Sequence, residues 1–73
     1  MNANVIARHL EEARVQLAAA MALHVEASSL MAQMSPALRV ATRAGIEATI
    51  EKRHANVVRL QALLNKADAE ETV

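Results

Sequence analysis

The 73-residue sequence has no cysteine and no phenylalanine, tyrosine or tryptophan. Without cysteine there is no disulfide bond and no thiolate zinc site. Without those aromatic rings there is no flat surface on which a base or a sugar could stack. The core must therefore consist of leucine, isoleucine, valine, methionine and alanine. Because so short a chain buries little surface and has no cross-link, association with another chain is the stabilising device that remains.

Neither sign of charge is in excess, since eight basic residues stand against eight acidic ones. Their distribution is uneven. Residues 1–35 hold two basic and three acidic side chains, residues 36–66 hold six basic and two acidic, and the last residues hold three acidic. A basic middle and an acidic tail are typical of solvated helix faces, and they are also able to steer a charged partner.

Long uncharged runs are absent too. The longest, Val15–Val25 and Ala27–Leu38, fall short of the ~20 residues that a membrane span needs. The first residues lack the basic-then-apolar order of a secretory signal. We therefore expect a soluble, cytoplasmic protein that does not enter membranes.

Motifs for catalysis are missing: there is no glycine-rich phosphate loop and no nucleophile in a catalytic context. Glu51 and His54 have the Glu-x-x-His spacing of di-iron bundles, but no other carboxylate is expected level with them. We therefore predict a non-enzymatic protein without a metal or another cofactor.

The single proline divides the chain. Ser35 is a favoured N-cap, Pro36 suits the first helical position, and the flanking residues are mostly good helix formers. The sequence predicts an all-α antiparallel hairpin over residues 1–67, with helices at about 3–33 and 36–67 and a turn at about 34–36. Residues 68–73 are expected to form a frayed acidic tail. The alternative is one long helix kinked at Pro36.

Apolar residues recur at alternating spacings of three and four, which is the pattern of a coiled-coil seam. More of them are present than one stripe per helix can hide, so we expect a second contact surface, and a homodimer in the form of a four-helix bundle satisfies it. The residues predicted to serve self-association or partner binding are Leu10, Leu17, Met21, Leu23, Leu30, Met31, Ile46, Ile50, Val57, Leu60 and Leu64.

Each predicted helix has one apolar stripe, its seam, and a polar residue interrupts each of these two seams. If facing residues have numbers that sum to roughly 70, His24 lies near Glu47 and Arg53 lies near Leu17. We expect a His24 ring nitrogen to be satisfied by Glu47 or by a backbone carbonyl, and such polar groups fix register and oligomeric state. A pH-sensing role for His24 is the alternative.

These features favour a small protein–protein interaction module, a chaperone, adaptor or inhibitor, that binds a helical partner or target surface through its apolar faces. Arg39, Arg43 and Arg59 would orient that partner by pairing with acidic groups. The alternative function is nucleic-acid binding, because the layout resembles the Rop-like RNA-binding hairpin dimers in length and topology. That resemblance implies that the arginine-rich second helix contacts phosphates.

Overall fold

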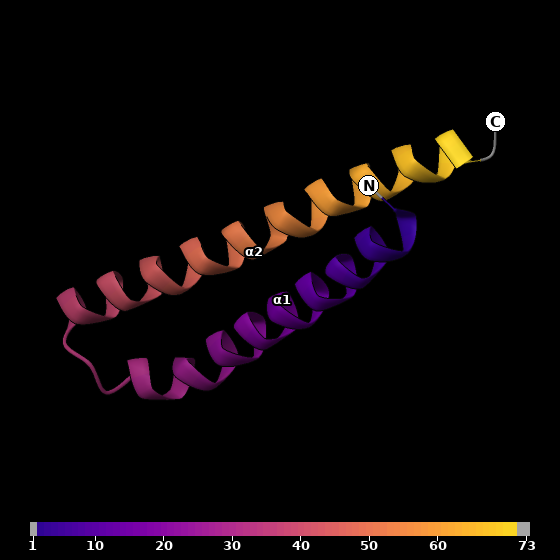
Figure 1. The fold of residues 1–73 in the computed structure, drawn as a ribbon. Coiled ribbons are helices and arrows are strands. Elements are labelled where there is room, and N and C mark those ends of the chain that lie inside the picture. Colours follow the sequence, from indigo (N-terminus) through magenta and orange to yellow (C-terminus); the bar gives the residue numbers. More distant parts are fainter. Residues whose placement is uncertain (1, 72–73) are drawn as a thin grey trace.

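The computed structural model of the chain describes residues 2–71 and contains two helices, α1 (Ala3–Met31) and α2 (Pro36–Glu71). They lie side by side and antiparallel, joined by a short turn, and at the other end of the hairpin α2 extends beyond the start of α1 (Figure 1). The predicted all-α hairpin is confirmed. The alternative of one kinked helix is wrong, because Pro36 begins a helix that returns along the first.

Each helix begins at a side-chain cap. Asn2 accepts a hydrogen bond from the backbone N–H of Asn4 at 2.8 Å, so its side chain satisfies one of the free donors that open a helix. Ser35 does the same for α2, where its hydroxyl accepts from the N–H of Leu38 at 3.4 Å. Pro36 follows in the first helical position, where its missing N–H is not needed.

The ends of the helices differ from the prediction. Helix α1 ends at Met31 and not near Gln33, and α2 continues past Ala67 to Glu71. Alanine and glutamate favour the helix there, and this preference outweighs the unfavourable position of acidic side chains at a helix C-terminus, which is a small effect. Residues 72–73 of the predicted tail lie outside the described residues, and fraying of the tail stays a prediction.

The best-packed part of the hairpin lies far from the turn. There Leu10 and Ala13 of α1 pack with Leu60 of α2, and Val57 and Leu64 lie against them. Leu10 is only 3% exposed. Towards the turn the seam is less well covered, since Leu17, Ala20, His24 and Ala27 are half-buried and only Met31 is buried again.

The molecule is long and thin, at 57 × 16 × 12 Å. Its radius of gyration is 16.7 Å, whereas a compact chain of this length would have about 11 Å. Each of the two antiparallel helices buries one stripe of side chains against the other and leaves most of its surface in water. Apolar side chains outside these two stripes therefore remain exposed.

Candidate interaction surface

The structure divides the predicted apolar contact residues into three groups. Leu10, Met31 and Leu60 are buried inside the hairpin. Leu17, Ile46, Ile50, Val57 and Leu64 are half-buried in the seam between the helices. Met21, Leu23 and Leu30 are exposed, and the two leucines are 58% and 64% exposed. The first two groups hold the hairpin together, so the third is the one available to another molecule.

Exposed apolar side chains outnumber buried ones. Over the described residues 2–71, four apolar residues larger than alanine are buried, namely Ile6, Leu10, Met31 and Leu60. In the same part of the chain, ten large apolar side chains are exposed: Val5, Val15, Met21, Leu23, Val25, Leu30, Leu38, Val40, Val58 and Leu63. Single exposed apolar residues are ordinary on a protein surface, but this excess leaves apolar area that a second apolar surface would cover.

One side of the hairpin is hollowed along the line where the helices meet. A hollow of about 540 Å³ lies between Ala19, Ala20 and Leu23 of α1 and Gly45, Ile46 and Thr49 of α2. A second hollow of about 350 Å³ lies further from the turn, between His9 and Glu12 of α1 and Arg59 and Leu63 of α2. Gln16 lines both hollows, so we treat them as one feature and call it the groove.

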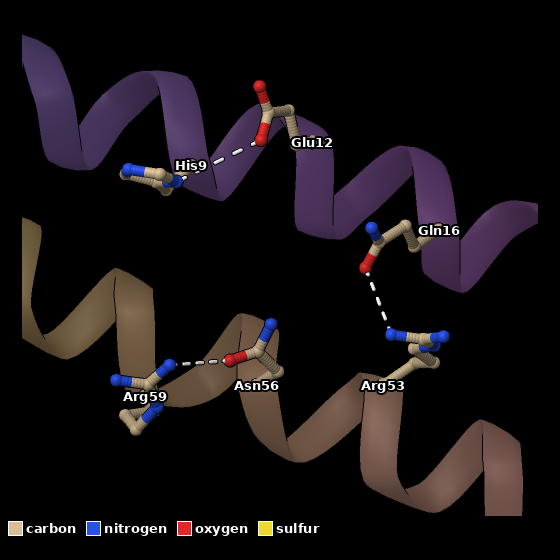
Figure 2. Close-up of polar contacts among 6 residues, drawn as sticks. All are labelled: His9, Glu12, Gln16, Arg53, Asn56 and Arg59. Atoms are coloured by element: carbon tan, nitrogen blue, oxygen red, sulfur yellow. Dashed lines mark hydrogen bonds and ion pairs between the residues drawn. The ribbon is translucent and has the colours of Figure 1, made fainter.

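Two hydrogen bonds between side chains tie the helices together. Arg53 donates to Gln16 Oε1 at 3.1 Å, and this bond spans the groove (Figure 2). Arg14 donates to Gln61 Oε1 at 2.9 Å. The predicted register placed Arg53 near Leu17, and its observed partner Gln16 is the adjacent residue. Arg53 itself is exposed and reaches out of the seam, because its long side chain carries the guanidinium to water and to the amide of Gln16.

The remaining charged residues near the groove have local partners. His9 Nδ1 lies 3.8 Å from a Glu12 carboxylate oxygen, in an exposed pair on α1 (Figure 2). Arg59 donates to Asn56 Oδ1 at 2.7 Å on α2. Arg43 is exposed. Exposed pairs of this kind contribute little to stability, so Glu12 and Arg59 can exchange partners at small cost.

His24 is half-buried and lines a hollow of about 430 Å³ with Arg39, Arg43 and Glu47. Its Nδ1 is buried and has no hydrogen-bond partner. The prediction that Glu47 or a backbone carbonyl satisfies this nitrogen is therefore wrong. Glu47 lines the same hollow but is exposed, so its carboxylate remains in water. His24 is a polar residue in a packing face, and a buried ring nitrogen without a protein partner is expected to lower the stability of the hairpin.

Arg39 binds different groups from those predicted. From the start of α2 its Nε donates to the carbonyl of Met31 at 3.0 Å, and its Nη2 donates to those of Ala32 at 3.4 Å and Met34 at 3.1 Å. The last carbonyls of a helix lack partners within the helix and carry its negative partial charge. Arg39 supplies both hydrogen bonds and positive charge, so it closes the turn of this chain and is not free to orient a partner.

We expect Arg39→Gln to lower the free energy of unfolding by about 1 kcal/mol, because glutamine cannot provide the charge or the fork of donors that reaches three carbonyls. Urea denaturation followed by circular dichroism at one fixed protein concentration measures it. Arg43→Gln, an exposed arginine one turn further along α2, is the matched control and should change stability little. Equal effects of the two substitutions would contradict the capping role.

Gly45 and Gln16 are two of the groove residues that the sequence did not single out. The chain has one glycine, and it lies in the interior of a 36-residue helix. An isolated glycine inside a helical pattern often marks a place where something packs closely, and this signal was available from the sequence. The pairing of Gln16 with Arg53 depends on side-chain conformations, so the sequence pattern alone does not show it.

Over residues 2–71, neither helix has the length and apolar character to cross a membrane. Across the same residues, histidine, aspartate and glutamate side chains do not gather in a group of three that could hold a metal ion. The chain matches no protein-family model, no curated protein and no solved structure.

Proposed function

We propose that this protein is a non-enzymatic interaction module that binds helices of a partner through exposed apolar side chains on the groove side of its hairpin. The partner is another helical protein or a second copy of the chain, and with a second copy the assembly is a four-helix bundle. The observation that carries the proposal is the excess of exposed over buried large apolar side chains. Chaperone, adaptor and inhibitor are all roles that such a surface supports.

The binding surface is best placed on the groove side of α1. Leu23 lines the groove, and Leu30 follows it by seven residues, which is two turns along the same side of a helix. Burial of one such leucine contributes roughly 1.5–3 kcal/mol when the side chain is fully covered. A partner helix lying in the groove would cover both leucines and the half-buried Ile46 below them.

Nucleic-acid binding is the weaker candidate. Of the four arginines on α2, Arg39 is engaged with carbonyls at the end of α1 and in the turn, and Arg53 with Gln16, which leaves Arg43 and Arg59 for phosphates. A nucleic acid would also have to approach a chain whose charges balance overall. A gel shift with duplex or hairpin RNA that weakens steeply with salt would favour this function over the interaction module.

Leu30→Glu tests the proposed function. We expect at least a tenfold loss of affinity for the partner, because the substitution places a charge on the apolar contact surface. The measurement is capture of partner proteins on the full chain from cells of the native source, with quantitative mass spectrometry.

Val15→Glu is the matched control, since Val15 is 61% exposed and lies on α1 outside the groove. Partners should be retained by the wild type and by Val15→Glu and lost from Leu30→Glu. If Leu30→Glu retains every protein that the wild type captures, the assigned surface is wrong.

A further inference from the structure

Gly45 has no structural purpose within the hairpin. A Cβ atom built at this position meets no atom within 4 Å, so there is space for a larger residue. Glycine in the interior of a helix is about 1 kcal/mol less favourable than alanine. The backbone at Gly45 is helical and needs no positive φ. What glycine provides here is a hollow in the floor of the groove, into which a side chain from outside can fit.

The same groove also presents a projecting side chain. Leu23 lines the hollow with Gly45 but belongs to α1, and it is 58% exposed. A large apolar side chain and an apolar hollow thus lie level with each other on one face. A two-fold symmetric interface requires such self-complementarity, because each chain must contribute both members of every contact.

We propose that a second copy of this chain fills the groove, with Leu23 of each copy packed against Gly45 of the other. The inference rests on the proposed function and names the partner for that surface. The two-fold axis runs parallel to the helices, so that α1 of one copy lies on α2 of the other and both turns are at the same end. Every neighbouring pair of helices in this bundle is antiparallel, which is the common arrangement of four-helix bundles.

The surface area of the chain agrees with one such contact. The hairpin exposes 5430 Å², whereas a compact protein of 7.9 kDa exposes about 4,400 Å². The excess is about 1,000 Å² for each copy. A standard interface buries about 800 Å² on each partner, so pairing of two copies removes about the surface by which this chain exceeds a compact monomer.

The charges favour this arrangement. Equal numbers of basic and acidic residues mean that two copies carry no net repulsion. Glu12 and Arg59 line the same hollow, and with α1 lying on α2 of the other copy each faces its opposite charge across the interface. If the two-fold axis were instead perpendicular to the helices, α1 would lie on α1 of the other copy and α2 on α2 of the other copy. Full overlap would then bring the Lys52 and Arg53 side chains of the two copies together, and they would repel.

The test measures dissociation constants by analytical ultracentrifugation of the full chain, with helicity checked by circular dichroism. The wild type is expected to sediment as a dimer of the 7.9 kDa chain at concentrations of tens of micromolar. Gly45→Leu fills the hollow from within, and Leu23→Ala removes the projecting side chain. Each should raise the dissociation constant at least tenfold while the helicity is retained, because the hairpin itself has space at Gly45.

The double variant Leu23→Ala, Gly45→Leu decides whether these two residues touch. It exchanges the sizes, so that the leucine introduced at position 45 of one copy meets the small residue at position 23 of the other, and it should associate more tightly than either single variant. Val15→Ala, outside the groove, is the control and should leave the dissociation constant unchanged.

Two results would overturn the inference, and they differ in meaning. A folded wild-type monomer at 100 μM would exclude the second copy as occupant, and the proposed function would then depend on the capture of other proteins by Leu30. A wild-type dimer whose double variant is weaker than both single variants would show that Leu23 and Gly45 do not meet. Association through the apolar side would still stand in that case.

Discussion

Leu10→Ala is expected to destabilise the hairpin by roughly 2–5 kcal/mol, the range for deletion of a buried leucine side chain. Leu10 is 3% exposed and lies in a cluster in which buried side chains of both helices meet, with Ala13 and Leu60. Alanine at this position would lie one turn from Ala13 on the same helix and leave a cavity beside Leu60 that rigid helices cannot close. Because small domains have only about 5–15 kcal/mol of stability in total, a loss of this size removes much of it.

Urea denaturation followed by helicity at 222 nm, at one fixed protein concentration, measures the effect. Val15→Ala is the matched control on the same helix. Val15 is 61% exposed, so this substitution should change the free energy of unfolding by less than about 0.5 kcal/mol. A result in which Leu10→Ala and Val15→Ala are equivalent would mean that the Leu10 cluster does not hold the helices together.

The fold was predictable because the spacing of the apolar residues and the signal for the start of the second helix agree. The seam of threes and fours required helices, and Ser35 followed by Pro36 fixed where the second helix starts. The register followed from the position of the turn, as the bond between Gln16 and Arg53 shows. The end of α1 was less predictable, because Arg39 from the other helix covers its last carbonyls and no local pattern reports such a contact.

The candidate surface was only partly predictable. Leu23 and Leu30 lie off the seam in the sequence, and both are exposed in the structure. Arg39 and His24 were assigned the wrong partners, because a pattern identifies the face on which a residue lies but not the atoms that its side chain reaches. For Arg39 those atoms are carbonyls within the chain, and for His24 Nδ1 there are none.

The distribution of packing along the hairpin connects the fold with its proposed partner. The cluster around Leu10 and Leu60 holds the open end of the hairpin, and Arg39 holds the turn. Between them Leu17, Ile46 and Ile50 are only half-buried, and the larger part of the groove lies over this stretch. The two helices therefore pack most weakly where an additional helix has most to cover, so the proposed assembly would complete the seam between them.

His24 is the residue whose substitution should raise stability most. Its Nδ1 is buried without a partner, and a buried polar group left unsatisfied costs about 1–3 kcal/mol. Leucine at position 24 removes that nitrogen and places a branched apolar side chain in the seam. We expect His24→Leu to raise the free energy of unfolding by about 1–2 kcal/mol, below the full range because the ring is only half-buried.

The control is His54→Leu, since His54 is exposed on α2 and its substitution should leave stability nearly unchanged. Both variants are compared with the wild type by urea denaturation at the same protein concentration. Their oligomeric state is measured alongside, because a polar seam residue can set register and oligomer number at the expense of stability. Loss of partner capture by His24→Leu with the same fold and the same oligomeric state would show that the imidazole acts in binding. A gain in stability with partner capture intact would show that it is a packing residue whose nitrogen the hairpin leaves unsatisfied.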